Sequence, residues 1–358
     1  MNSKKIKIGI IGCGRVFAHY MEIFKKRKIR DYEIVAICEK KKSLLNQYSK
    51  KLNCLKFTSY LEMLTKMRNI IDLIIVLTPS GNHYQHSKLA LENNFNVLCE
   101  KPATMIPKEC LILERLSKQK GLVFGVAFQN RFNKSVKTLK YLLKKNKFGK
   151  INIVNVRLLW CRFQNYYKDE WHGRWKSDGG VTNQQAIHHI DIARWLFGPV
   201  KKVNSIMTNQ INKLQAEDTN NTLIKYKNDV MGIIQLTTSV RPKDIQASIE
   251  VIGDKGFMVL GGIALNKIDR YFFKNLTKNE VRMINNSNEK VKNGYGNSHQ
   301  IVLSKMFECI KKKNNFPINA TESYKTENLI HSMYMSDEKR KWVNVKNNNL
   351  SKRLGKND

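Results

Sequence analysis

The stretch Gly9-Ile-Ile-Gly12-Cys-Gly14-Arg15-Val16 decides the fold of this 358-residue chain. It continues the apolar run 6–11, which is typical of a strand covered on both faces, and it leads into a helix predicted over 15–27. Glycines between a strand and a helix permit a tight turn and the close approach of a pyrophosphate, which the helix N-terminus holds. Phe17 stands where a third glycine would complete the dinucleotide-binding pattern, so the strand–turn–helix context carries the assignment.

Strand and helix signals alternate from this stretch to about residue 125. The predicted strands are 6–11, 33–38, 70–77, 95–99 and 122–127, and the predicted helices are 15–27, 41–52, 83–93 and 107–120. Repeated strand–helix units form parallel, doubly wound sheets. We therefore expect an N-terminal Rossmann domain over 1–125.

The pattern changes after residue 130, where several strands follow one another closely. The predicted strands are 151–160, 200–211, 219–226, 231–239 and 247–252, and the predicted helices are 135–145, 186–197, 299–312 and 321–342. This order indicates an open, mostly antiparallel sheet with helices on one face. The expected second domain, for substrate and oligomer contacts, spans 126–345, and a polar tail over 346–358 is expected to fray.

Composition excludes several classes of protein. No run of about 18 apolar residues predicts a membrane span, and no signal peptide is evident at the N-terminus. The seven scattered cysteines form no Cys-x-x-Cys pair, which indicates reduced thiols in a cytoplasm and no metal site. The formal net charge is +35, but the lysines are spread along the whole chain without a nucleic-acid-binding motif. We expect no nucleic-acid partner, although such a field would steer a phosphate-bearing substrate.

Two further segments complete the predicted cofactor edge. Glu39 ends the second strand, where a carboxylate accepts hydrogen bonds from an adenosine ribose, so NAD is favoured over NADP. Lysines 40–42 could instead hold a 2′-phosphate, and Glu39 could simply be solvated. The turn Thr78-Pro79-Ser80-Gly81-Asn82-His83 follows another strand at its carboxyl end, where ligands of open α/β sheets sit. The alternative for His83 is a helix-start residue without a chemical role.

The tripeptide Glu100-Lys101-Pro102 directly follows the apolar strand 95–99. A lysine at the end of a buried strand is costly unless it has a partner or a chemical role. The proline fixes the backbone beside it, so the lysine is presented at a defined angle. We interpret Lys101 as a group aimed at a nicotinamide and a substrate hydroxyl.

A histidine-rich helix carries the second half of the predicted site. Gly179-Gly180 allows a sharp entry, after which Gln184, His188 and Asp191 stand on one helix face at i, i+4 and i+7. His189 lies about 100° away on the helix and is the weaker candidate. Removing a hydride from a carbinol carbon requires a base near neutrality, and a histidine or a desolvated lysine fits this role. The alternative is an ordinary helix histidine, but the expected pairing with Asp191 favours the base.

These motifs, in this order, resemble the Gfo/Idh/MocA oxidoreductase family. They are Gly12-Cys-Gly14-Arg15, Thr78-Pro-Ser-Gly-Asn-His83, Glu100-Lys-Pro102 and Gly179-Gly180…His188-x-x-Asp191. The resemblance implies a Rossmann domain with an open-faced α/β domain, a bound nicotinamide dinucleotide, and chemistry at a sugar or cyclitol hydroxyl. It also implies that Lys101 contacts substrate and cofactor and that His188 is the acid/base.

A narrower resemblance concerns the UDP-N-acetylglucosaminuronate 3-dehydrogenase branch, which serves surface-polysaccharide synthesis. It rests on Gln129-Asn-Arg131-Phe-Asn and on Arg174-Trp175-Lys176-x-Asp178-Gly-Gly. Inositol-type members have an aspartate four residues before the histidine, where this chain has the neutral amide of Gln184. The expected substrate-binding residues are Lys101, Arg131, Arg174, Trp175, Asn183, Gln184 and His188, with Lys176 as a further anion-binding candidate. The expected cofactor-binding residues are Gly9, Gly12, Gly14, Arg15, Val16, Glu39, Thr78, Pro79, Ser80, Asn82, His83, Glu100, Lys101 and Gln129.

The predicted reaction is thus the oxidation of a secondary hydroxyl, at C3, of a nucleotide-linked amino sugar or uronic acid. Two alternatives remain open: a dehydrogenase of a free sugar or polyol, and a non-catalytic NAD-binding regulator on the same fold. An open sheet face often packs on a second copy, so a homo-oligomer, dimer or tetramer, is expected.

Overall fold

The computed structural model describes residues 5–25 and 30–356. It contains two compact units. The first joins Met1–Phe128 to His299–Lys325, and the second joins Gln129–Ser298 to Thr326–Asp358. The sequence analysis put the boundary near residue 125 and assigned 299–325 to the second domain, so the observed units differ from it chiefly in that segment.

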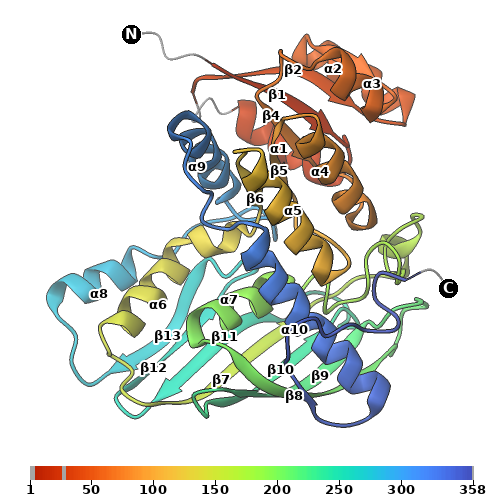
Figure 1. The fold of residues 1–358 in the computed structure, drawn as a ribbon. Helices are drawn as coiled ribbons and strands as arrows, with labels where there is room; N and C mark the ends of the chain where they lie inside the picture. The colour runs from red at the N-terminus through yellow and green to blue at the C-terminus, as the bar shows by residue number, and fades with distance from the viewer. Residues whose placement is uncertain (1–4, 26–29, 357–358) are drawn as a thin grey trace. The chain divides into compact units, whose positions relative to one another are not determined.

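The first unit is built on a six-stranded parallel sheet with the order β3-β2-β1-β4-β5-β6 (Figure 1). The strands are β1 (Ile6–Ile11), β2 (Tyr32–Cys38), β3 (Leu55–Phe57), β4 (Leu73–Val76), β5 (Asn96–Cys99) and β6 (Phe124–Val126). All five strand pairings are parallel, which confirms the predicted Rossmann sheet. The strand order reverses on the two sides of β1, and ligands of such sheets bind at this switch point.

The helices of the first unit follow the predicted pattern with one addition. They are α1 (Arg15–Lys25), α2 (Lys42–Leu52), α3 (Tyr60–Lys66), α4 (His83–Glu92), α5 (Pro107–Gln119) and α9 (His299–Lys312). Helix α3 was not predicted. It begins at Ser59, whose side chain accepts a hydrogen bond from the Glu62 N–H, as an N-cap does.

The segment 299–325 belongs to the first unit because its contacts lie there. Helix α9 packs against α1. Beyond α9, the Ile318 carbonyl accepts a hydrogen bond of 2.8 Å from the Val126 N–H and so extends the edge strand β6. These partners are more than 170 residues away in the sequence, and local patterns could not indicate them.

The second unit contains an eight-stranded mixed sheet with the order β13-β12-β11-β7-β10-β9-β8-β14. The strands are β7 (Ile151–Leu159), β8 (Val200–Thr208), β9 (Thr219–Tyr226), β10 (Met231–Thr237), β11 (Gln246–Gly253), β12 (Gly256–Gly261), β13 (Lys267–Phe273) and β14 (Val343–Asn344). Only the pairing of β7 with β10 is parallel among these strands, so the mostly antiparallel expectation is confirmed. Strands β12, β13 and β14 were not predicted.

Helices cover one face of this sheet. They are α6 (Lys134–Lys144), α7 (Ile187–Phe197), α8 (Lys278–Asn285, not predicted) and α10 (Ala320–Lys339), most of which belongs to this unit (Figure 1). The strand register places a row of partly exposed apolar side chains on the opposite face: Ile153, Ile206, Leu223, Met231, Ile233, Ile252, Phe257 and Phe272. The sheet therefore has one helix-covered face and one open, apolar face.

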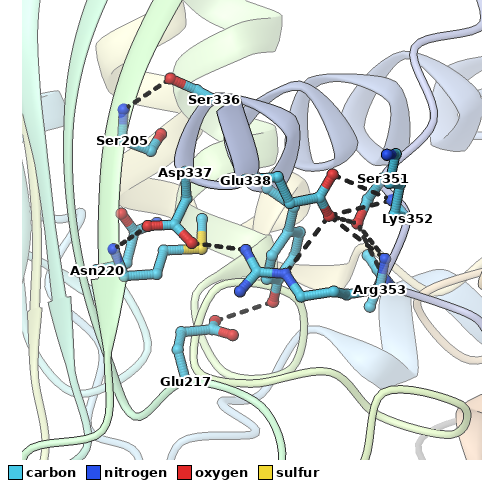
Figure 2. Close-up of polar contacts among 12 residues, drawn as sticks. Ser205, Glu217, Asn220, Ser336, Asp337, Glu338, Ser351, Lys352 and Arg353 are labelled. Atoms are coloured by element: carbon cyan, nitrogen blue, oxygen red, sulfur yellow. Dashed lines mark hydrogen bonds and ion pairs between the residues drawn. The ribbon is translucent and has the colours of Figure 1, made fainter. Parts of the chain in front are cut away.

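Residues 346–356 of the tail that was predicted to fray pack against α10, and residues 357–358 lie outside the described residues. Ser351 and Leu354 are buried, and the Ser351 N–H donates to His331 Nδ1 at 3.0 Å. The Glu338 carboxylate accepts from the backbone N–H groups of Lys352 and Arg353 (Figure 2). These contacts could not be predicted from the sequence, because the segment is polar and shows no apolar pattern that would indicate packing. Within residues 5–25 and 30–356, no helix is long and apolar enough to cross a membrane.

Candidate active site

The glycine loop joins β1 to α1 at the switch point of the first unit. Gly12 has φ +96°, and a Cβ there would lie 2.8 Å from the Leu77 carbonyl, so only glycine fits. Gly14 is exposed, and a Cβ on it would meet no atom within 4 Å. The fold requires glycine at the first position but leaves space at the second, which suits the approach of a pyrophosphate to the start of α1. Arg15 and Val16 begin that helix at the same edge, Arg15 exposed and Val16 half-buried.

Gly9 has a different role from the one predicted. It lies inside β1, and a Cβ on it would approach the Ile71 and Ile74 side chains to 2.6 and 2.8 Å. Its missing side chain therefore makes room for core packing. Phe17, at the third glycine position of the pattern, is fully buried against Tyr48.

Glu39 follows β2 and is tied to the glycine loop. Its Oε2 accepts from the Cys13 N–H at 2.8 Å, and its Oε1 accepts from the Lys41 N–H at 2.9 Å. Each carboxylate oxygen retains a second lone pair, so hydrogen bonds from a ribose diol remain chemically possible. The residues of this edge therefore fit a dinucleotide.

His83 joins the second predicted cofactor segment to the Glu-Lys-Pro turn. Its Nδ1 lies 2.6 Å from the Pro102 carbonyl oxygen, and its Nε2 lies 2.7 Å from the Thr78 carbonyl oxygen. Burial lowers the pKa of His83. Ser80 is buried, whereas Pro79 is half-buried and Asn82 is exposed in the short helix Ser80–Asn82. His83 thus acts as a buried link between two loops of one sheet edge.

The Glu100-Lys101-Pro102 turn is held from both sides. The Glu100 carboxylate is buried, accepts a hydrogen bond of 3.0 Å from the Tyr20 hydroxyl, and lies 3.3 Å from His299 Nε2. Burial alone would raise the pKa of Glu100, but its contacts with His299, Lys101 and Tyr20 outweigh burial and lower it. Glu100 is thus committed to Tyr20 and His299, and the half-buried Lys101 is the residue of the turn suited to a ligand.

The turn before α7 is anchored by a buried carboxyl group that the sequence analysis did not single out. The Glu217 Oε1 accepts from the Thr182 N–H at 3.0 Å and from the Tyr334 hydroxyl at 2.9 Å. A Cβ on Gly180 would lie 2.0 Å from the Glu217 carbonyl oxygen, so the glycine is required. Burial raises the pKa of Glu217.

His188 lies in the first turn of α7 and is half-buried. Its Nε2 is 3.5 Å from the amide nitrogen of Gln129, in the short helix η2 (Gln129–Phe132). Gln129, which was predicted to bind the cofactor, lies beside the candidate base. Gln184 precedes α7 and is half-buried like His188.

Asp191 is not positioned as the partner predicted for His188. Its two carboxylate oxygens accept bidentate hydrogen bonds from Arg131, with Nε–Oδ2 at 2.7 Å and Nη2–Oδ1 at 2.6 Å. Both side chains are buried. Arg131 is therefore withdrawn as a group for substrate anions, because its guanidinium neutralises a buried carboxylate.

The remaining predicted substrate-binding residues fall into two groups, one exposed to solvent and one packed against other residues. Arg174 and Lys176 are exposed on the loop before the double glycine. Trp175 packs edge-on to Tyr334 and lies under Arg353, whose Cζ is 5.0 Å from the indole centroid. Asn183 is buried and donates to the Asp178 carbonyl at 2.8 Å. Trp175 and Asn183 thus have structural partners, while the two cations are accessible.

Two family models match the chain, one on each part. Residues 6–128 match an oxidoreductase family's NAD-binding Rossmann fold, and residues 140–345 match that family's C-terminal alpha/beta domain. The first part of the chain is thus an NAD-binding Rossmann domain.

Solved structures of sugar-nucleotide enzymes are similar over nearly the whole chain. The WlbA dehydrogenase from Bordetella pertussis, solved with NADH and UDP-GlcNAcA, is 26% identical with a TM-score of 0.90 and covers 96% of this chain and 99% of its own. The WlbA dehydrogenase from Chromobacterium violaceum, with the same ligands, is 26% identical with a TM-score of 0.88 and covers 96% and 97%.

Another relative is named for a sugar substrate that is not linked to a nucleotide. D-glucoside 3-dehydrogenase of Escherichia coli is 27% identical over 215 residues, which are 57% of this chain and 58% of that enzyme. The chain thus aligns with little more than half of this relative's length.

Proposed function

This chain belongs to the Gfo/Idh/MocA oxidoreductase family, and we propose that it is an NAD-dependent dehydrogenase that oxidises a secondary hydroxyl, at C3, of a nucleotide-linked amino sugar or uronic acid. The main support for this proposal is that both candidate catalytic residues, Lys101 and His188, are present on the elements where they were expected. Lys101 stands in the anchored Glu-Lys-Pro turn of the NAD-binding unit, and His188 stands in the first turn of α7. A non-catalytic regulator would need neither.

In this proposal the residues have separate roles. The bound dinucleotide supplies the hydride acceptor. Lys101, a cation with three donors, stabilises the alkoxide that develops on the substrate oxygen. His188 takes the hydroxyl proton, and Gln129 orients its ring. Asp191 accepts hydrogen bonds from Arg131, so its carboxylate is neutralised by that guanidinium.

The nucleotide-linked substrate is supported by the two WlbA enzymes, which resemble this chain over nearly its full length. The exposed Arg174 and Lys176 are the proposed contacts for the substrate's anionic groups. Participation in surface-polysaccharide synthesis follows as part of the same proposal.

Oxidation of a free sugar at C3 is the second candidate. The resemblance to D-glucoside 3-dehydrogenase supports it, because that relative is 27% identical over 57% of this chain, against 26% over 96% for the WlbA enzymes. The two candidates share the chemistry of Lys101 and His188 and differ in the groups attached to the sugar.

Turnover of a substrate panel tests the proposal. The purified enzyme with NAD is offered UDP-N-acetylglucosaminuronate, UDP-N-acetylglucosamine and free hexoses, and formation of NADH is followed by absorbance. We expect turnover of a nucleotide sugar, with His188→Ala lowering kcat by about 10²–10⁴-fold. Lys101→Ala lowers it strongly, whereas Lys66→Ala, at an exposed i,i+4 pair with Glu62, leaves it unchanged.

Three outcomes would redirect the assignment. Turnover of free hexoses alone selects the second candidate. Full activity in both Lys101→Ala and His188→Ala disproves the mechanism. Tight NADH binding without turnover of any sugar indicates the regulator.

We also propose that the enzyme is a homo-oligomer assembled through the open sheet face of the second unit. The exposed apolar row on β7–β13 gives that face the character of an interface. Light scattering after gel filtration would detect the oligomer, and Ile233→Lys with Leu223→Lys, which are directly paired across β10 and β9, should dissociate it.

A further inference from the structure

We propose that Gln185 and His189 form an uncharged hydrogen-bonding wall beside His188 that binds neutral polar groups of the sugar ring. The inference rests on the proposed function and adds to it two residues that specify which part of the substrate contacts α7. It assigns the ring hydroxyls or an acetamido group, and not the carboxylate or the phosphates, to this wall.

The first observation is that both side chains are buried without hydrogen-bond partners. Gln185 is 8% exposed and His189 is 2% exposed. Neither amide atom of Gln185 and neither ring nitrogen of His189 finds a partner among residues 5–25 and 30–356. A buried polar group left in this state costs about 1–3 kcal/mol, and folded proteins rarely retain one. Two together indicate groups held ready for a ligand.

Their positions place these groups at the candidate base. Gln185 precedes His188 by three residues, and His189 follows it directly, so both belong to the entry of α7. Two more buried oxygens in the same state, on the Gln129 and Asn130 side-chain amides, lie in η2. Helix η2 contacts α7, and the Gln129 amide nitrogen is 3.5 Å from His188 Nε2. Unpartnered groups thus occur on both of the elements that meet at His188, the entry of α7 and η2.

The chemistry of the wall selects its ligand. Burial lowers the pKa of His189 to about 4, so at neutral pH its ring offers one donor and one acceptor. Gln185 offers two donors and a carbonyl acceptor. The nearby charged pair is self-contained, since Arg131 neutralises Asp191. A wall of mixed donors and acceptors without net charge matches hydroxyl and amide groups, and it offers no compensation for an anion.

The His189 ring packs edge-on with the Trp160 ring. The two ring centroids are 6.5 Å apart at an interplanar angle of 86°. This edge-to-face contact involves the rings and leaves both imidazole nitrogens without a hydrogen bond.

The test uses the opposite effects of these residues on stability and on binding. Gln185→Leu and His189→Phe each replace an unpartnered polar group by an apolar one of similar size. We expect the free protein to keep or raise its Tm in both variants. For the nucleotide sugar, KM should rise about tenfold or more while kcat changes little, because the lost contacts exist before and during the reaction.

Asn266→Leu is the matched control for stability. Its amide is also buried, but it donates to the Glu289 carbonyl at 2.6 Å and accepts from the Ala264 N–H at 3.2 Å. This variant should lose stability, which shows that the assay detects the loss of a satisfied amide.

Several results would overturn the inference. If Gln185→Leu and His189→Phe lose stability like Asn266→Leu or fail to fold, the polar atoms have structural partners such as internal water. If they are stable and keep the wild-type KM, no ligand uses them. Failure of the proposed function is distinguishable, because the wild-type protein would then show no thermal shift with UDP-N-acetylglucosaminuronate or hexoses in the presence of NADH.

Discussion

Arg131 and Asp191 form a buried, bidentate ion pair that joins η2 to α7, the helix that bears His188. The guanidinium also lies 4.9 Å from the Trp195 ring centroid, and the Thr326 hydroxyl donates to Asp191 Oδ1 at 2.7 Å. Arg194 Nη2 also lies 3.5 Å from Asp191 Oδ1. The pair therefore fixes the position of α7 and has no capacity left for a substrate anion.

Removing one member of this pair should be strongly destabilising. Asp191→Ala leaves a buried, uncompensated guanidinium, and we expect a loss of about 3–5 kcal/mol in the free energy of unfolding, measured by urea denaturation. Asp229→Ala, which removes the exposed partner of Lys225, should have little effect. Equal effects of the two substitutions would show that burial does not set the strength of the Arg131 contact.

Two glycines of the cofactor loop should respond differently to alanine. Gly12→Ala forces a side chain into a positive-φ position 2.8 Å from the Leu77 carbonyl, so both thermal stability and NADH affinity should fall. Gly14→Ala meets open space, so stability should be retained while NADH affinity falls. Thermal unfolding and NADH fluorescence titration separate the two effects. Unchanged NADH affinity in Gly14→Ala would mean that no ligand approaches this position.

Local patterns explain why much of the fold was predictable. Strands β1, β4 and β5 could be predicted because a parallel strand buried on both faces needs a run of apolar residues. The glycine loop could be predicted because a phosphate-binding turn needs glycines. Lys101 and His188 were likewise predicted from their motifs. Strand β13 has the sequence Lys-Ile-Asp-Arg-Tyr-Phe-Phe, in which three charged residues interrupt the apolar pattern, and β14 has only two residues; both were missed.

Long-range partners explain most of what was not predictable. Arg131 looked like an anion-binding residue because the ion pair with Asp191 spans 60 positions in the sequence. Glu100 looked like a cofactor residue, since nothing near it in sequence revealed the contact with His299. From the sequence, His189 was considered only as a weaker candidate for the base and Gln185 was not singled out, because only the burial of their polar atoms distinguishes these residues.

Buried histidines predict a loss of stability in mild acid. Burial lowers the pKa of His86 and of His189 from 6.5 to about 4. Between these values the unfolded chain binds protons that the folded protein does not, so stability falls as pH falls from about 6.5 towards 4. The raised pKa of Glu217 has the opposite sign, because it reduces stability as pH rises above 4.5.

Urea unfolding at several pH values checks the histidine effect. His86→Leu removes one titrating group, so the free energy of unfolding should depend less steeply on pH between 6.5 and 4 than in the wild-type protein. An identical slope would show that His86 is protonated equally in both states.

The C-terminal segment should stabilise the turn that precedes α7. The Glu338 carboxylate accepts hydrogen bonds from the Ser351 hydroxyl and from the N–H groups of Lys352 and Arg353 (Figure 2). The segment then reaches the loop before α7, where the Gly355 N–H donates to the Trp175 carbonyl at 2.9 Å. The same loop continues into Gly179, where a Cβ would lie 2.8 Å from the Leu354 side chain. Glu338 therefore holds a segment that packs on the loop before α7, at Trp175 and Gly179.

Glu338→Ala should release this segment. The hydrogen bonds from Ser351, Lys352 and Arg353 to one charged acceptor disappear, so we expect faster proteolysis after Lys352 and Arg353 and faster amide exchange over 173–180, measured by mass spectrometry. Because the loosened loop carries Arg174 and Lys176, KM for the nucleotide sugar should rise more than kcat falls. Glu308→Ala, which removes exposed pairs with Lys305 and Lys312, serves as the control and should leave proteolysis and KM unchanged. If amide exchange over 173–180 stays at the wild-type rate while the C-terminal segment is cleaved, the segment does not support the loop.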